Sequence, residues 1–386
     1  MARQWRRLLH ELKLSTRGRG DAGTRASQRS TASQSSTRGR GEAATRVSEI
    51  TAVIVSWKDA EQVEEAIESI VRARTRITGA GPRVSVVVVD NGSGLPGRVQ
   101  AICPDATLIA NPSNRGLAAA SNQGARAASG DILLFLNPDT RAEEDPFSAL
   151  AEGFDAHPEA AALAPRLLDA PAAPVPGGSS SSPAAGLRRS LAPPDREDQF
   201  TFQLRRLPRL ASDARELLLL EHLRPNSTGR RQSRYADEDR DSPFPVEQAA
   251  GAALAVRAAA FERIGGFDES FVPAWFEDVD LCARLAAEGK ILYWPAARFR
   301  HAGGVSSARL GYDRFLPILY TNALLYRRKH YGRASRAAYR AMLAGGMALR
   351  LAGIPFRPKM PRDRGEAARA YRAVLRIALG MTGSGP

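Results

Sequence analysis

The chain has 386 residues, 43% hydrophobic and 25% charged, which is enough to bury the core of one large domain or two. Its 33 glycines and 25 prolines form no collagen-like repeat, and two cysteines are too few for a disulfide framework. No apolar run reaches the roughly 18 residues of a membrane span, and the first long one begins near Ile50, too late for a secretory signal. We therefore predict a protein of the reducing cytosol, soluble or bound to a membrane surface.

The net charge of +14 is concentrated at the two ends of the chain. Residues 1–47 carry +8 and residues 326–386 carry +12, which leaves about −6 for the middle. We predict a disordered basic tail over 1–47 and a basic amphipathic helical tail over 326–386, with Arg333, Arg336 and Arg340 on one helix face. Such ends attract the phosphates of anionic lipids or of nucleic acid, although a packing helix with a solvated basic edge would look similar.

Strand and helix patterns alternate from Ile50 onward. Apolar strand-like runs at 51–57, 83–93, 106–112 and 131–139 are separated by helical patterns. This alternation predicts an α/β fold with a doubly wound, mostly parallel sheet that is covered on both faces. Ligands of such sheets bind at the carboxyl ends of the strands. Asp90 and Asp139 both follow a strand, and two acids at one edge favour a site over two separate turn caps.

The regular pattern is interrupted between residues 169 and 245. The run APAAPVPGGSSSSPAAG has the composition of a flexible linker, and a mixed, charged stretch follows it. We predict that 169–245 is a flexible linker or an insertion over the ligand-binding cleft. The ordered pattern then resumes and extends to about residue 325, so the central domain is predicted to span 48–325.

Several common catalytic motifs are absent. The chain has no GxxxxGK[ST], GxSxG or HExxH motif, and no GxGxxG after its first strand. What remains is His301 and three carboxylates in four residues, Glu277, Asp278 and Asp280. Acids in a first helical turn can simply complement the helix dipole. The aromatic pair just before them favours a proton-transfer role in a turn that faces a sugar.

Six sequence blocks resemble a known family. VIVSW, VVVDNGS, NPSNRGLAAASNQGARAASGDILLFLNPDT, QAAGAALAVRAAAFERIGGFDE, FEDVDLCARLAAEGK and RHAGGVSS occur in the order seen in family 2 glycosyltransferases. The chain most resembles the rhamnosyltransferase-type branch, over about residues 50 to 330. The resemblance implies a GT-A fold and inverting transfer of one sugar from a nucleoside diphosphate donor. It favours dTDP-rhamnose, then a UDP-hexose or UDP-galactofuranose.

The resemblance also implies partners and residue roles. The acceptor would be a lipid-linked or cell-envelope glycan at the cytoplasmic face of the plasma membrane. Asp139 and His301 would hold Mg²⁺ or Mn²⁺, with weak affinity because Asn137 stands where the DxD motif has its first acid. Asp278 would be the general base, with Glu277 and Asp280 placing the acceptor. Nucleotide-sugar binding is implied for Ser56, Trp57, Asp90, Asn91, Asn114, Arg115, Gly116, Asn122 and Asn137.

Three other readings remain open from the sequence. A nucleic-acid-binding protein would explain the basic ends, but these ends lack interleaved aromatics and the middle is acidic, so no nucleic-acid partner is expected. A nucleotidyltransferase can share a related sheet, but no basic phosphate loop follows the first strand. A non-catalytic relative would not need Asp139, Asp278 and His301 together. The absence of the QxxRW motif of processive synthases predicts the addition of single sugars.

Overall fold

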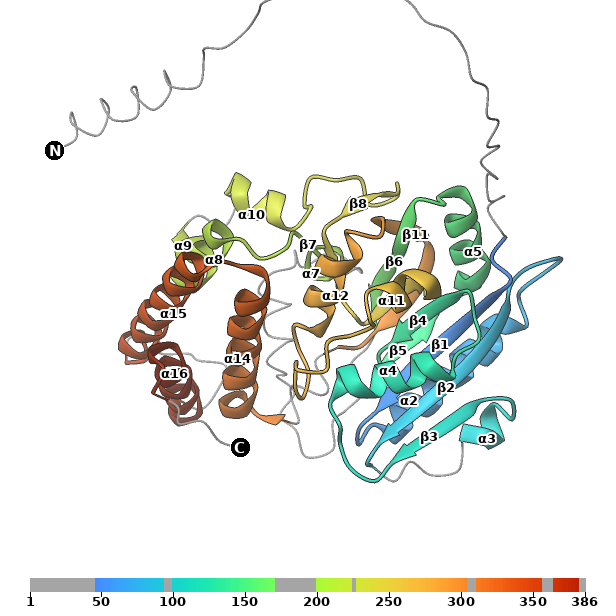
Figure 1. Cartoon of the computed structure of the whole chain (residues 1–386), viewed down its shortest axis with the longest axis horizontal. Helices are drawn as coiled ribbons and strands as arrows, with labels where there is room; N and C mark the ends of the chain where they lie inside the picture. Colours follow the sequence, from blue (N-terminus) through green and yellow to red (C-terminus); the bar gives the residue numbers. More distant parts are fainter. Residues whose placement is uncertain are drawn as a thin grey trace, which may run out of the picture. The chain divides into compact units, whose positions relative to one another are not determined.

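The computed structural model describes residues 46–93, 99–170, 199–223, 227–303, 310–355 and 364–381. Most of the predicted N-terminal tail, up to residue 45, and residues 171–198 of the segment predicted at 169–245 lie outside these ranges. The described chain is a mixed α/β structure with a mostly parallel central sheet, and Figure 1 shows a group of helices from the C-terminal part of the chain beside it. This confirms the predicted fold class.

The sheet has nine strands in the order β3-β2-β1-β4-β10-β6-β11-β5, and β8 pairs with β11. The first four of these run parallel, as expected for strands joined by crossover helices, and β10 is inserted antiparallel between β4 and β6. The strands are β1 (Glu49–Ser56), β2 (Arg83–Asn91), β3 (Thr107–Asn111), β4 (Ile132–Leu136), β5 (Thr140–Ala142), β6 (Ala160–Asp169), β8 (Phe244–Val246), β10 (Ala253–Arg257) and β11 (Lys290–His301).

Helices cover both faces of the sheet because the strands are apolar on both. In β1, Ala52 and Ile54 belong to a core with α2 (Ala60–Arg74) and α5 (Pro146–Ala156). The alternate residue, Val53, belongs to a second core on the other face. The helices of that face are α4 (Leu117–Ala127), α11 (Ala258–Arg263) and α12 (Glu277–Leu285). A short helix, α3 (Val99–Ile102), precedes β3.

The runs ILYWP (residues 291–295) and ARFRH (residues 297–301) lie in one strand, β11. Its pairing with β6 continues through an irregularity between Trp294 and Arg298, because both halves find partners along the same neighbouring strand. The strand therefore reaches the carboxyl edge of the sheet and ends there at His301.

The described part of the predicted insertion is folded. After residue 198 the chain forms α7 (Phe200–Gln203), β7 (Leu204–Arg205), α8 (Leu210–Leu217), α9 (Leu220–Leu223) and α10 (Thr228–Ser233). β7 pairs with β9 (Gln248–Ala249), which lies four residues before β10, and this pairing ties the segment to the sheet domain. The segment also contributes Leu217 to a helical core described next.

The C-terminal helices are α14 (Tyr312–His330), α15 (Arg333–Gly353) and α16 (Arg364–Leu379), and they share a hydrophobic core with Leu217 of α8. α14 crosses the domain boundary predicted at residue 325 without a break. The reason is burial on both sides of that point: Tyr326 packs in a cluster with Phe271 and Val279 of the sheet domain. Among the helices that the structure describes, none is long and apolar enough to cross a bilayer.

Candidate functional site

The carboxyl ends of β1 and β2 place Ser56 beside Asp90 as register partners. Asp90 Oδ1 accepts hydrogen bonds from the backbone N (2.9 Å) and Oγ (2.5 Å) of Ser93. The Ser56 hydroxyl is buried and has no hydrogen-bond partner among the described residues. An unsatisfied buried polar group costs about 1–3 kcal/mol. The Ser56 hydroxyl can therefore bond to a polar atom that the described residues do not supply.

Asn91 connects two of the predicted nucleotide-sugar segments. Its Nδ2 donates to Asn114 Oδ1 at 2.8 Å and to the Gly116 carbonyl at 3.3 Å, and its Oδ1 accepts from the Arg115 backbone N at 3.0 Å. Gly92 has φ +80°, and a Cβ there would lie 2.6 Å from facing backbone, so the turn requires glycine. The structure thus brings the 91–93 and 114–116 turns together.

Asn122 and Trp57 are two further residues predicted to bind the nucleotide-sugar, and neither side chain has a hydrogen bond or ring contact with the 91–93 or 114–116 turn among the described residues. The Asn122 amide binds the backbone N and O of Phe267 (2.9 Å each) and Glu269 Oε1 (3.0 Å). It therefore ties α4 to the segment that follows α11. Trp57 is half-buried after β1, with Lys58 Nζ 5.1 Å from its ring centre.

Asp139 and His301, the predicted metal ligands, face each other at the same edge. Asp139 lies in the turn between β4 and β5, and antiparallel pairing of β5 with β11 brings His301 opposite. His301 Nε2 is 3.3 Å from Asp139 Oδ1, and both side chains are buried. Gly303 N donates to Asp139 Oδ2 at 2.7 Å, and Asn137 Nδ2 is 3.4 Å from His301 Nε2. Burial alone would raise the pKa of Asp139, but the His301 ring and the Gly303 N–H outweigh it and lower that pKa.

The pair fits a cation that is shared with a substrate. In the described parts of the chain no group of three or more His, Cys, Asp and Glu side chains is arranged to hold a metal, so Asp139 and His301 would be a two-ligand set. Mg²⁺ in phosphate-transferring sites is commonly bound by one or two carboxylates, with substrate phosphates and waters as the other ligands. An imidazole nitrogen also suits Mn²⁺.

The turn before α12 is strained and is held from outside the sheet. Trp275 and Phe276 both have φ 74°, a left-handed conformation that costs a side-chain-bearing residue on the order of 1 kcal/mol or more. Asn322 Nδ2 of α14 lies 2.9 Å from the Ala274 carbonyl and 3.0 Å from the Trp275 carbonyl. Trp275 packs edge-on against Phe315 of α14, at 4.8 Å between ring centres. The aromatic pair expected to face a sugar is thus engaged by α14.

Glu277 and Asp278 have different surroundings although they are adjacent. Asp278 Oδ2 accepts from Gly251 N (3.0 Å) and Oδ1 from Val279 N (2.8 Å), whereas Glu277 Oε2 is buried and has no hydrogen-bond partner in the described part of the chain. Burial and the Asp278 charge raise the pKa of Glu277 to about 8. Burial also raises the pKa of Asp278, and the two N–H groups work against that rise. Glu277 is therefore the member that keeps a proton near neutral pH, and Asp278 is the member that can carry charge.

The Asp278 carboxylate and the turn that carries Asp139 are hydrogen-bonded to two consecutive residues, Gly251 and Ala252. Gly251 N donates to Asp278, and the next carbonyl, that of Ala252, accepts from Asn137 N and Thr140 Oγ1, both at 3.0 Å. The structure thereby brings together the predicted base and the predicted metal ligands, which are far apart in sequence.

Asp280 is placed differently from its neighbours. It is 1% exposed, Oδ2 accepts from Arg284 Nε at 2.7 Å, and Oδ1 lies 2.7 Å from His330 Nε2. Both oxygens are engaged inside the protein. Its observed contact is a link from α12 to the end of α14, not an open position for an acceptor.

Sequence reasoning missed three residues at this site. Arg205 of β7 is half-buried, and its charge lowers the pKa of Asp278 against the effect of burial. Gln199 contacts His301, and Gly303 contacts Asp139. Arg205 and Gln199 come from the segment predicted to be a linker, which has no motif, so no sequence signal marked them.

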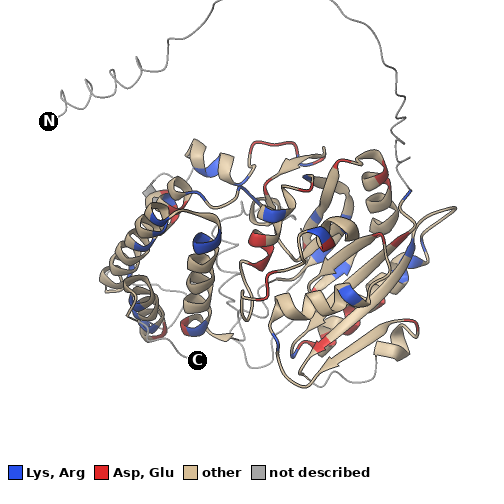
Figure 2. Ribbon diagram, in the orientation of Figure 1, with Lys and Arg blue, Asp and Glu red and all other residues tan. Residues whose placement is uncertain are grey.

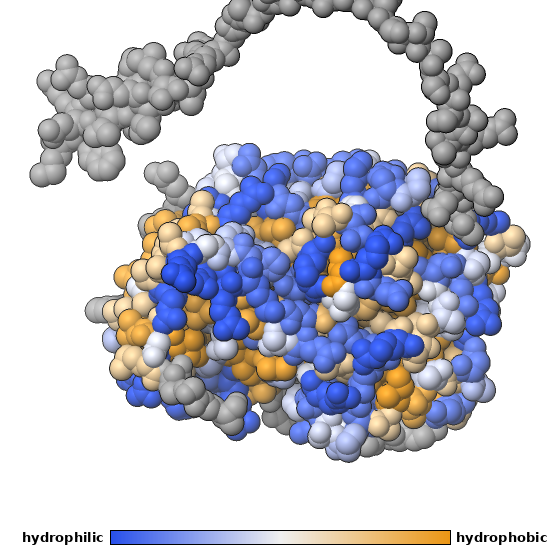
Figure 3. All heavy atoms as spheres, in the orientation of Figure 1, coloured by the Kyte–Doolittle hydropathy of each residue, from blue (hydrophilic) through white to orange (hydrophobic). Residues whose placement is uncertain are grey.

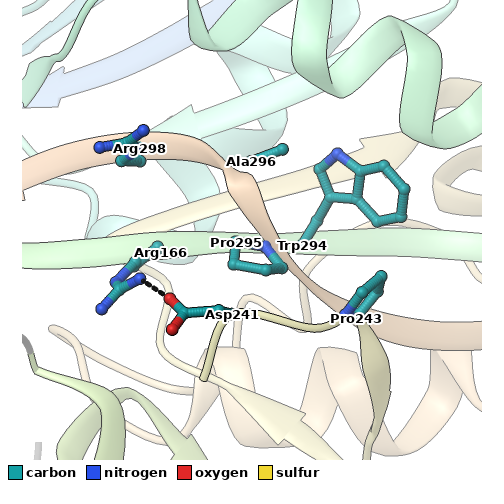
Figure 4. A pocket seen from close by; sticks show the side chains of 7 residues that line it. All are labelled: Arg166, Asp241, Pro243, Trp294, Pro295, Ala296 and Arg298. Carbon is teal, nitrogen blue, oxygen red and sulfur yellow. Dashed lines mark hydrogen bonds and ion pairs between the residues drawn. The ribbon is translucent and has the colours of Figure 1, made fainter. Parts of the chain in front are cut away.

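A separate cavity of about 440 Å³ lies at the irregularity in β11. Figure 4 shows Arg166 paired with Asp241 across it, near Trp294 and Arg298. None of the predicted site residues lines this cavity, so it is distinct from the strand-end site.

Comparison with known proteins shows which enzymes this chain resembles. Residues 51–171 match the family model described as Glycosyl transferase family 2. The chain is 27% identical over 317 residues to the N-acetylglucosaminyl-diphospho-decaprenol L-rhamnosyltransferase of Mycobacterium tuberculosis (strain CDC 1551 / Oshkosh), covering 78% of this chain and 91% of the relative. It is 29% identical over 221 residues to the pre-mycofactocin glycosyltransferase of the same strain, covering 56% of this chain and 37% of that protein.

Among solved structures, a mannosyltransferase from Pyrobaculum calidifontis, in complex with GDP-Man and Mn²⁺, aligns with a TM-score of 0.47 and 15% identity, covering 88% of this chain and 87% of that one. The region matched by the family model includes the strand-end residues from Ser56 to Asp139. The family and the enzyme class expected from the sequence blocks are thus confirmed: residues 51–171 form a glycosyltransferase family 2 domain, and the chain is similar to a rhamnosyltransferase over 78% of its length.

Proposed function

We propose that the chain transfers one sugar, with inversion, from a nucleoside diphosphate donor to a lipid-linked glycan, with dTDP-rhamnose as the first donor to test. The observation that carries the proposal is the attachment of Asp278 to Gly251 and of the Asp139 turn to Ala252, which supports a role for Asp278 as a base beside a diphosphate bound at this edge. The similarity to an N-acetylglucosaminyl-diphospho-decaprenol L-rhamnosyltransferase, over 78% of this chain and 91% of that protein, supports rhamnose as the sugar and a lipid-linked acceptor.

The donor would lie across the carboxyl ends of β1, β2 and β4. The unpaired Ser56 hydroxyl and Asp90 would receive the nucleoside, beside the turns that Asn91 joins. Asp139 and His301 would hold Mg²⁺ or Mn²⁺. When bound, such a cation acts as a Lewis acid that neutralises the charge developing on a diphosphate leaving group.

Asp278 would take the proton from the acceptor hydroxyl as that oxygen attacks the sugar. Its two backbone N–H donors and the nearby Arg205 favour the ionised form, and Glu277 stays neutral beside it so that the two do not compete for charge. Asp280 would hold α12 in place through its bonds to Arg284 and His330. Inversion follows from attack opposite the leaving group, with the base on the side of the incoming hydroxyl.

The pair Asp278→Asn and Glu277→Gln tests this assignment. Loss of a general base costs about 10²–10⁴-fold in kcat, so Asp278→Asn should lose transfer while its binding of nucleoside diphosphate, measured by calorimetry, is unchanged. Glu277→Gln keeps a neutral group and should retain transfer near pH 7. Full activity of Asp278→Asn, or its failure to bind nucleotide, would refute the assignment.

Calorimetric titration of dTDP, UDP, GDP and ADP, each with and without Mn²⁺, identifies the donor base. Saturable binding of dTDP that tightens with Mn²⁺ supports the preferred donor and the metal pair. Selective binding of UDP would replace dTDP-rhamnose with a UDP-sugar. Binding that ignores Mn²⁺ would remove the metal role of Asp139 and His301, and no binding of any nucleotide would refute the transfer reaction.

We also propose that the C-terminal helices dock on an anionic membrane at the inner face of the plasma membrane, where a lipid-linked acceptor would be located. α16 exposes a row of arginines, Arg369, Arg372 and Arg376, and the outer face of α15 exposes alanines and Leu349. Figure 2 shows basic residues along both helices, and Figure 3 shows apolar surface interleaved with hydrophilic surface on that side. Arg336 and Arg340, predicted to line one basic face, are half-buried instead.

A further inference from the structure

We infer that Gln199 is a positioning residue that fixes the tautomer of His301 and so presents His301 Nε2 to the cation. Gln199 lies just before α7 and is 4% exposed. Its Nε2 donates to the His301 carbonyl at 2.6 Å and to Asp169 Oδ1 at 2.9 Å. Its Oε1 lies 3.0 Å from His301 Nδ1.

The orientation of this amide follows from its partners. A backbone carbonyl only accepts hydrogen bonds, and an ionised carboxylate also only accepts, so both must face the NH₂ group of Gln199. The oxygen Oε1 is then left to face His301 Nδ1. An amide oxygen only accepts, so Nδ1 must carry a hydrogen, and in the neutral ring Nε2 holds the free lone pair.

Asp139 pulls the ring toward the opposite tautomer. Its Oδ1 lies 3.3 Å from His301 Nε2, and a carboxylate there favours a hydrogen on Nε2. A ring with Nε2–H has no lone pair to offer a cation at that position. Gln199 opposes this tautomer, because it would leave Oε1 facing a bare Nδ1. Asn137 Nδ2, 3.4 Å from His301 Nε2, also favours a lone pair on that nitrogen, but the Gln199 contact at 3.0 Å is the shorter of the two. Gln199 is therefore the main group that keeps Nε2 available at the Asp139 pair.

Metal-binding histidines commonly donate their second N–H to such a partner, and loss of the partner lowers metal affinity by about 10–100-fold. Here the partner comes from the segment that follows residues 171–198, and it is 102 positions from His301. Gln199 also fixes its own place by its backbone, since its N donates to the Leu167 carbonyl of β6 at 2.9 Å.

Gln203 supplies a matched control. It is buried one turn later and fastens α7 to the same strand, with Oε1 accepting from Leu167 N at 3.1 Å and Nε2 donating to the Pro165 carbonyl. No contact between Gln203 and His301 is present among the described side chains. Gln203→Leu thus removes a comparable buried amide and leaves the ring partner in place.

The inference rests on the proposed function for the cation, but the tautomer can be measured without any metal. Long-range ¹H–¹⁵N spectra of the metal-free full chain, with His301→Ala for assignment, report which ring nitrogen carries hydrogen. We expect hydrogen on Nδ1 in the wild type and in Gln203→Leu. In Gln199→Leu we expect the Nε2–H form with a bare Nδ1. Hydrogen on Nδ1 in Gln199→Leu would overturn the inference.

Mn²⁺ binding by electron paramagnetic resonance, with dTDP or UDP present, gives the second readout. We expect Kd for Mn²⁺ to rise about 10–100-fold in Gln199→Leu and to stay within about two-fold of wild type in Gln203→Leu. An equal rise in both variants would overturn the inference, because a general loosening of α7 would then explain it. A wild type that carries hydrogen on Nδ1 but binds no Mn²⁺ would overturn the metal role while the tautomer assignment holds.

Gln199→Glu keeps the test decisive if the leucine variant does not fold. Its carboxylate retains an acceptor for Nδ1–H but loses the donors to the His301 carbonyl and Asp169. We expect a lower Tm with the Nδ1–H form intact. Loss of the Nδ1 hydrogen in this variant would contradict the inference.

Discussion

The strand-end edge and the Asp278 turn differ in what holds them in place. At the edge, Asn91 bonds to the 114–116 turn of the adjacent crossover, and Ser56 is set beside Asp90 by parallel pairing. At the turn, the strained Trp275–Phe276 pair depends on Asn322 of α14, 47 residues downstream of Trp275. The sheet supports the first region with its own backbone, whereas the second depends on packing from a later part of the chain.

The largest expected effect comes from a substitution at the strand-end edge that removes the Asp139 charge and keeps the hydrogen bond from Gly303. Asp139→Asn keeps an acceptor for the Gly303 N–H but removes the charge that faces His301. We expect kcat/KM to fall by about 10³-fold, since a Lewis-acid contribution is worth several kcal/mol. Steady-state kinetics over a range of Mn²⁺ concentrations check this. Asp145→Asn, at the cap of α5, is the control and should leave kcat/KM unchanged. An unchanged kcat/KM in Asp139→Asn would show that transfer does not depend on the Asp139–His301 pair.

The second prediction concerns the pH dependence of the unfolding free energy that Glu277 causes at the Asp278 turn. The Glu277 pKa is raised in the folded chain to about 8 from its ordinary 4.5, so the folded state holds this proton more tightly than the unfolded state does. Stability from this group is present below about pH 4.5 and is lost as pH rises through about 8. Between pH 5 and 8 the wild type should lose about 2–4 kcal/mol of unfolding free energy that Glu277→Gln does not lose. Urea denaturation at the two pH values measures it, and parallel losses in both proteins would contradict it.

The third prediction tests whether membrane binding depends on the C-terminal helix α16 and not on the sheet domain. Replacing Arg369, Arg372 and Arg376 by Gln should weaken binding to anionic vesicles by roughly 100-fold, because each basic residue near such a surface is worth about 1 kcal/mol. Turnover of a short soluble acceptor should not change. The control replaces three exposed arginines of the sheet domain by Gln, namely Arg83, Arg263 and Arg298.

Cosedimentation with vesicles and retention on DNA distinguish the outcomes of that comparison. Equal loss of vesicle binding in the two triple variants would show that only net charge matters. Strong DNA retention that falls with the α16 variant, without vesicle binding, would favour a nucleic-acid partner over a membrane.

The smallest expected effect tests the support of the turn by α14. Asn322→Ala removes the donors to the 272–275 carbonyls and should lower unfolding free energy by about 1–2 kcal/mol. It should lower kcat about 10-fold with little change in nucleotide Kd, because the Asp278 turn moves and the strand-end edge does not. Thr321→Ala, an exposed neighbour, is the control. Equal loss of nucleotide affinity would show that the two regions are not independent.

Much of the edge could be predicted from the sequence. The period and apolarity of the 51–57, 83–93 and 131–139 runs indicated parallel strands, and Asp90 and Asp139 lie at the ends of such strands as expected. The pairing of Asp139 with His301 was implied by family resemblance alone, because no spacing rule connects residues that far apart. The roles of Asp278 as base and of Asn122 as a nucleotide residue stay predictions.

The sequence by itself determined the strands β1 to β4, their parallel arrangement and the carboxylates of the α12 turn, because these depend on local periodicity and on residues adjacent in the chain. Only the tertiary structure decided which carboxylate is which: Asp278 receives backbone N–H groups from Gly251 and Val279, Glu277 receives none at Oε2, and Asp280 is bonded to Arg284 and His330. It also placed Gln199 on His301 and Asn322 behind the Asp278 turn. These contacts join residues far apart in the chain, and their energies depend on burial and on the direction of single hydrogen bonds, which no local pattern encodes.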